Sequence, residues 1–119
     1  MIKLVRTLGK TAPPKVFAMI PPPLMQQAAY GMNQTVINSV YPKLVPMIGQ
    51  TNNVDGIVDF YSTMGGVADW ESKFPKSCTR DSTWPSCKYW CDAQSCDQCH
   101  PNDDGYAHLA PVLMKGIGL

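Results

Sequence analysis

The hydrophobic positions of the first half of the chain predict two helical segments separated by a short strand. Apolar residues recur every third position over 2–8, which predicts the last turns of a helix. A continuous apolar run over 15–20 ends in three prolines, which predicts a strand buried on both faces. Helical spacing of apolar residues over 33–48, interrupted by two prolines, predicts a kinked helix or two short helices.

The second half predicts a strand, a long loop and a final helix. The run 54–61 follows an Asn-Asn turn and predicts a second buried strand. Residues 73–99 show neither a strand period nor a helix period, so we expect a long loop. Asn102 is expected to cap a last helix that reaches residue 117, kinked or shortened by Pro111. This order is typical of α/β units on a mostly parallel sheet, where sites lie beyond the carboxyl ends of the strands.

Composition and charge argue against several partners. The chain has 119 residues and a formal net charge of +1, so nothing favours nucleic acid or an anionic membrane surface. Residues 16–42 carry no charge, but their prolines and amide side chains argue against a membrane span. The first ten residues lack an uninterrupted apolar core and a cleavage site, so we expect no signal peptide in this chain.

Five cysteines cluster in the predicted loop. They are Cys78, Cys87, Cys91, Cys96 and Cys99. Such clustering indicates disulfides or a metal site, and the odd number leaves one cysteine for pairing outside the chain. A glycosylation sequon at Asn33 is usable only on a secreted surface, so both features together favour disulfides and a secreted or secretory-lumen location. The alternative is zinc held by the thiolates, but their spacing is not a clean pair of C-x2-C knuckles; no metal and no cofactor are expected.

The candidate chemistry lies at the end of this loop, in the stretch DQCHPNDDGYAHLA over 97–110. Asp97 and His100 are three residues apart, a spacing that lets one turn supply both groups. An imidazole can take the proton of a serine hydroxyl, and a carboxylate can fix its tautomer. The proline, cap and glycine that follow fit the entry of a loop into a helix.

The stretch 97–110 resembles the last conserved block of the SGNH (GDSL-like) ester hydrolases. The strand PKVFAMIPPP at 14–23 is also similar to the penultimate strand of that family, and the helix at 31–48 is similar in particular to that of carbohydrate acetylesterases. The resemblance implies that 1–119 is the C-terminal part of a flavodoxin-like three-layer α/β fold. In such a part, a disulfide-rich loop at about 73–99 would precede the catalytic block and final helix at 97–117. It further implies that His100 deprotonates a serine and that Asp97 orients His100.

Two departures from the family limit what this chain does alone. The family's Gly-Asp-Ser block, which holds the nucleophile, is absent. A Gly-x-Asn-Asp block for the oxyanion hole is also absent, since Gly31-Met32-Asn33-Gln34 lies after the penultimate strand and ends in Gln. We therefore expect the chain to supply the Asp/His part of a serine ester hydrolase and to be inactive alone. The expected substrate is an ester, such as an acetylated carbohydrate.

An alternative is a non-catalytic, hydrolase-like subunit or remnant that packs against another polypeptide, which completes the sheet. A second alternative is a small zinc-stabilised module. Of the remaining ring side chains, His108 is expected to be solvated. The aromatic residues Trp70, Trp84, Tyr89 and Trp90 are expected to cover the stapled loop rather than to stack on a sugar.

Overall fold

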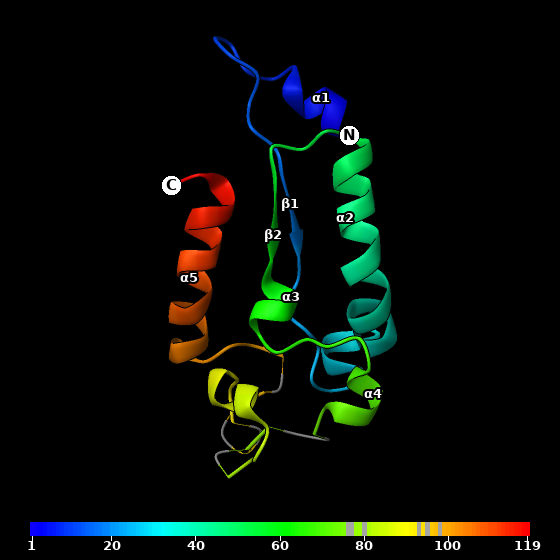
Figure 1. Ribbon diagram of the computed structural model, residues 1–119, viewed down its shortest axis with the longest axis vertical. Helices are drawn as coiled ribbons and strands as arrows, with labels where there is room; N and C mark the ends of the chain where they lie inside the picture. Colours follow the sequence, from blue (N-terminus) through cyan, green and yellow to red (C-terminus); the bar gives the residue numbers. More distant parts are fainter. Residues whose placement is uncertain (76–77, 80, 93, 95, 98) are drawn as a thin grey trace.

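A parallel two-stranded sheet lies between two long helices in the part of the chain that the structure describes (Figure 1). The computed structural model describes residues 1–75, 78–79, 81–92, 94, 96–97 and 99–119. The sheet pairs β1 (Phe17–Ile20) with β2 (Gly56–Asp59) in the register Phe17↔Gly56 to Ile20↔Asp59. The helices are α2 (Tyr41–Thr51) and α5 (Asp103–Ile117). This arrangement confirms the expected α/β class with a parallel sheet.

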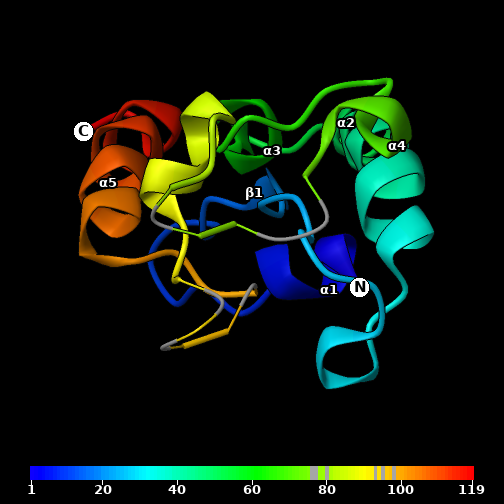
Figure 2. The ribbon, with the colours of Figure 1, turned by 90° about the horizontal axis from the view of Figure 1, so that it is seen from below.

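The two helices cover opposite faces of the sheet, as the view along the strands shows (Figure 2). Consecutive residues of a strand point to opposite faces. A Cβ placed on Gly49 of α2 would lie 3.2 Å from Cδ1 of Ile57, whereas one on Gly116 of α5 would lie 2.7 Å from Cγ2 of Val58. Each helix therefore approaches its own face of β2 closely because a glycine stands at the point of contact.

The hydrophobic core extends from the sheet into the cysteine-rich segment, the stretch between β2 and α5 that holds Cys78, Cys87, Cys91, Cys96 and Cys99. Val58 packs with Met25, Met64 and Leu109, and all four side chains are buried. Trp90 belongs to the same cluster, together with Cys78 and Cys87. The segment that we expected to be a loop is thus part of the core, and it also contains a short 3-10 helix, η3 (Pro85–Tyr89).

Two expectations for the strands were wrong in detail. The second strand ends at Asp59 rather than at 61, because the Asp59 carboxylate accepts from the backbone N–H of Ser62 at 2.9 Å and starts the helix α3 (Phe60–Thr63). The first strand is not buried on both faces, since Met19 is 46% exposed. Met19 shares the face of Val58, but α5 packs chiefly over β2 and leaves this part of the face open.

Both proline-containing regions that were expected to be helical are helical in the structure. Residues 34–51 are helical, with a π-helical stretch, η2 (Val36–Val40), running directly into α2. Pro111 does not shorten α5, which continues to Ile117 and ends at Gly118, whose φ is 81°. The shorter elements are α1 (Ile2–Arg6), η1 (Ala29–Gly31) and α4 (Trp70–Lys73). None of the helices among the described residues is long and apolar enough to cross a membrane.

Candidate acid–base site

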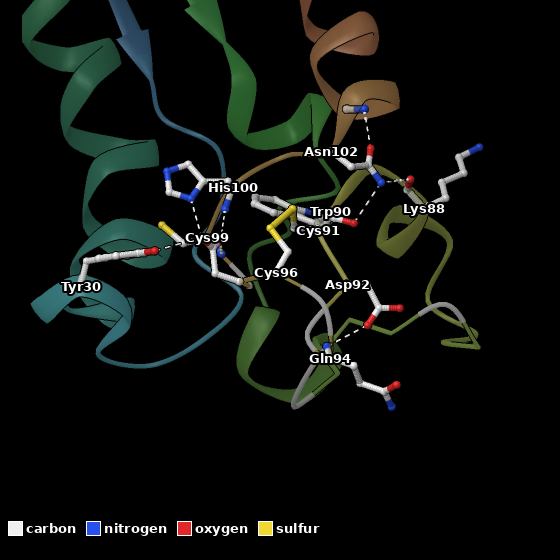
Figure 3. Close-up of a disulfide and its surroundings, with 12 residues drawn as sticks. Tyr30, Lys88, Trp90, Cys91, Asp92, Gln94, Cys96, Cys99, His100 and Asn102 are labelled. Atoms are coloured by element: carbon white, nitrogen blue, oxygen red, sulfur yellow. Dashed lines mark hydrogen bonds and ion pairs between the residues drawn. A yellow bond between two sulfur atoms is a disulfide. The ribbon is translucent and has the colours of Figure 1, made fainter.

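The segment 99–102 leads into α5 and lies beyond the carboxyl ends of the two strands (Figure 3). It runs beside residues 89–91 and is held there by backbone hydrogen bonds. The Cys91 N–H donates to the His100 carbonyl at 3.1 Å, and the Asn102 N–H donates to the Tyr89 carbonyl at 3.0 Å. Trp90 and Pro101 form an isolated antiparallel bridge between these bonds. The backbone that carries His100 is therefore anchored to the core.

Asn102 fixes the start of α5 to this segment. Its Oδ1 accepts from the Gly105 N–H at 2.9 Å, which confirms the expected cap. Its Nδ2 donates to the carbonyls of Lys88 at 2.8 Å and Trp90 at 3.0 Å. The Asn102 side chain thus connects the first turn of α5 to the end of η3 and to Trp90 directly after it.

The carboxylate of Asp97 organises the turn before His100. Its Oδ1 accepts from the backbone N–H groups of Cys99 at 2.9 Å and His100 at 2.8 Å. Its Oδ2 lies 2.8 Å from Nδ1 of His100. Because an ionised carboxylate only accepts, Nδ1 carries the proton, and Nε2 of the neutral ring is left as the acceptor. The His100 side chain is 55% exposed, so this acceptor is open to a reacting group.

Tyr30 is a member of the site that the sequence did not indicate. Its hydroxyl donates to Oδ2 of Asp97 at 3.1 Å, and its ring meets the His100 ring edge-on at a centroid distance of 5.8 Å. Tyr30 lies 67 residues before Asp97, on the segment between β1 and α2. In the sequence, the neighbouring Gly31 was the one local sign of the unusual backbone here, since Tyr30 and Gly31 both have positive φ values.

The electrostatics of the site follow from these contacts. Hydrogen bonds from the His100 side chain and then from the Cys99 amide hold the pKa of Asp97 well below its ordinary value of 3.8. The hydrogen bond to Asp97, followed by the charge of Asp97, raises the pKa of the Tyr30 hydroxyl above 10.0. Burial and then the Asp97 charge raise the pKa of the Cys99 thiol. Asp97 is consequently ionised at neutral pH, whereas Tyr30 and Cys99 keep their protons.

The expectation of disulfides is confirmed. Cys78 bonds to Cys87, and Cys91 bonds to Cys96, while Cys99 keeps a free thiol. The second bond ends one residue before Asp97 and so constrains the turn that carries the candidate base. The four cysteines in these two bonds have no thiolate with which to hold zinc. Among the described residues, no group of three or more metal-binding side chains occurs.

The other candidate residues do not belong to the Asp97–His100 pair. Asn33 is exposed, and its Oδ1 accepts from the Val36 N–H at 3.1 Å, so it caps the helical stretch rather than forming an oxyanion hole at His100. His108 is not solvated as expected, because it is half-buried and stacks on Tyr89 at a centroid distance of 4.3 Å. Hydrogen bonds between described residues join no serine hydroxyl to His100.

A cleft lies in the cysteine-rich segment, on the side of the Cys91–Cys96 disulfide. Its volume is about 1090 Å³, and its walls include Trp84, Trp90 and both cysteines of that disulfide. Neither Asp97 nor His100 lines this cleft. Trp90 is buried and Trp84 packs against the core, in keeping with aromatic residues that cover a stapled segment.

Comparison of the chain with protein-family models, with curated proteins and with solved structures finds no match. The described groups can accept a proton at Nε2 of His100, hold the resulting imidazolium against Asp97, and return the proton.

Proposed function

We propose that this chain supplies the acid–base half of a serine ester hydrolase of the SGNH type. The observation that carries the proposal is the 2.8 Å contact between Oδ2 of Asp97 and Nδ1 of His100 on the turn before the last helix. The position beyond the carboxyl ends of parallel strands supports it, since α/β folds place their sites there. The proposed fold is correspondingly the C-terminal part of a flavodoxin-like, three-layer domain.

In the proposed reaction the nucleophile is a serine from a Gly-Asp-Ser block outside this sequence. Nε2 of His100 takes the hydroxyl proton while the serine oxygen attacks the ester carbonyl carbon. The imidazolium then gives this proton to the departing alkoxide, which leaves an acyl-serine. Water repeats the sequence: His100 takes its proton as the water oxygen attacks the acyl carbon, and returns the proton to the serine. Asp97 holds the ring in the required tautomer throughout.

The proposed substrate is an ester, in the first instance an acetyl group on a carbohydrate. The support for this choice is the resemblance of the segment 31–48 to the corresponding helix of carbohydrate acetylesterases. The proposed location is a secreted or secretory-lumen one. Disulfides persist in such oxidising compartments, which is consistent with the bonds Cys78–Cys87 and Cys91–Cys96.

The transcript that encodes this chain provides the first test. We expect it to encode a Gly-Asp-Ser block and a Gly-x-Asn-Asp block before the present sequence, and the polypeptide with both blocks should release acetate from p-nitrophenyl acetate and acetylated xylan. His100→Gln in that polypeptide should lower kcat by about 10⁴-fold or more, whereas His108→Gln is the matched control and should not. A transcript without a serine block, or equal rates in wild type and His100→Gln, would overturn the proposal.

A second candidate function is a non-catalytic subunit that packs against another polypeptide. The observation that favours it is the 46% exposure of Met19 on the face of β1 that α5 leaves open. Within the described residues each strand of the sheet also has one unpaired edge, and isolated two-stranded sheets are marginally stable. A partner that adds a strand and a helix would satisfy both features.

Sedimentation of the isolated chain distinguishes this candidate. A subunit should self-associate or unfold when alone, and it should become a stable, defined complex with its partner. A folded monomer at concentrations from micromolar to near-millimolar would contradict the subunit function.

A further inference from the structure

The contacts of Tyr30 link two parts of the chain across the candidate site. On the α5 side of the site, the His100 carbonyl accepts a backbone hydrogen bond from the Cys91 N–H. Tyr30 reaches the site from the opposite side, from the segment that leads into α2 (Figure 3). Its hydroxyl shares Oδ2 of Asp97 with Nδ1 of His100, at 3.1 Å and 2.8 Å respectively.

The backbone of Tyr30 adopts an unfavourable conformation with little burial to hold it. Its φ is 52°, and two residues earlier Ala28 has a φ of 61°. L-residues rarely adopt this left-handed region, and such residues cluster at functional sites whose surroundings fix them. Tyr30 is 74% exposed, so packing in the core does not account for its conformation. Its side chain makes a hydrogen bond to Asp97 and an edge-on ring contact with His100.

We propose that Tyr30 is a positioning residue for the Asp97–His100 pair. The hydroxyl fixes the oxygen of Asp97 that also holds Nδ1 of His100, and the ring edge limits the rotation of the imidazole. Oδ1 of Asp97 accepts from backbone N–H groups of its own turn, those of Cys99 and His100. The bond from Tyr30 to Oδ2 adds a contact from outside the turn, which keeps the Asp97 carboxylate in one orientation. Its consequence for catalysis rests on the proposed function, but the coupling of the three side chains does not.

The hydrogen bond and the ring contact can be separated by Tyr30→Phe, which removes the hydroxyl and keeps the ring. In ¹⁵N NMR spectra of the present chain, we expect neutral His100 to have its proton on Nδ1. In Tyr30→Phe the Nδ1–H fraction should fall, because Asp97 is less firmly oriented. Tyr106→Phe is the matched control, since Tyr106 is also more than half exposed and lies on α5, and it should leave His100 unchanged.

A reciprocal measurement does not depend on the stability of that variant. The hydrogen bond to Asp97 raises the pKa of the Tyr30 hydroxyl, so Asp97→Asn should lower it towards its ordinary value in an NMR titration of the tyrosine rings. Unchanged His100 spectra in Tyr30→Phe, or an unchanged Tyr30 titration in Asp97→Asn, would overturn the inference.

The polypeptide that includes the serine block separates this inference from the proposed function. There Tyr30→Phe should lower kcat about tenfold with little change in KM, because a positioning residue acts through Asp97 and His100 rather than on substrate binding. If the wild-type polypeptide hydrolyses no ester while the NMR coupling is present, the proposed function fails and the positioning role stands. If it is active and Tyr30→Phe is equally active, the positioning role fails.

Discussion

Replacing Asn102 with alanine should destabilise the protein, because this side chain makes three hydrogen bonds at the start of α5. The exchange removes a helix cap, which contributes about 1 kcal/mol. It also removes two hydrogen bonds to the carbonyls of Lys88 and Trp90, each of about 1 kcal/mol. We therefore expect the free energy of unfolding to fall by about 3 kcal/mol. For a chain of this length that loss corresponds to a decrease in Tm of about 10 °C.

Denaturant unfolding followed by circular dichroism measures this loss, and two further variants divide it. Asn102→Ser keeps a capping oxygen but loses both amide donors, so it should lose about 2 of these 3 kcal/mol and lie closer to Asn102→Ala than to wild type. Asn52→Ala is the matched control, because Asn52 bonds only the Ile48 carbonyl at an exposed helix end, and it should cost less than about 0.5 kcal/mol. Equal stabilities of wild type and Asn102→Ala would refute the reasoning, and equal stabilities of the serine and alanine variants would refute the capping contribution.

Acid should remove the contribution of Asp97 to stability. Its folded-state pKa lies below the unfolded value of 3.8, so the stabilisation is fully present above that value and is lost as the pH falls through the folded pKa. Asp97→Asn should thus destabilise the chain at pH 7 and much less in strong acid; a difference independent of pH would contradict this. The double variant Cys91→Ser/Cys96→Ser should lower the free energy of unfolding by about 2 kcal/mol through lost loop closure, and an unchanged denaturation midpoint would speak against it. When the chain is secreted from eukaryotic cells, Asn33 should carry a glycan removable by peptide N-glycosidase, while Thr35→Ala should not; unmodified wild-type protein would exclude this site.

Features that depend on a few neighbouring residues could be predicted from the sequence. The three prolines after Ile20 end β1 because they lack the N–H that a strand needs. Asn102 caps α5 because its side chain is short enough to reach the Gly105 N–H three residues on. Asp97 meets His100 for the same reason: a spacing of three on a turn brings the two side chains together. Each of these results follows from short-range geometry.

The ends of the strands and helices were predicted less well, because local signals compete there. The apolar run 54–61 reads as one strand, but the Asp59 side chain captures the Ser62 N–H and changes the last part of the run into a helix. Pro111 was expected to kink or shorten the last helix, but α5 runs to Ile117, where the helix was expected to end. Packing of α5 against Val58 and the core compensates for the lost backbone donor.

By itself the sequence determined the α/β class, the proline-ended strand, the cap and the pairing of Asp97 with His100. Only the tertiary structure decided that Tyr30 reaches Asp97 and that α5 covers β2 but leaves Met19 exposed. It also decided which cysteines pair, with Cys99 left free. These features join residues that are distant along the chain or have several competing partners. Their proximity depends on the path of the whole backbone, and no local spacing encodes it.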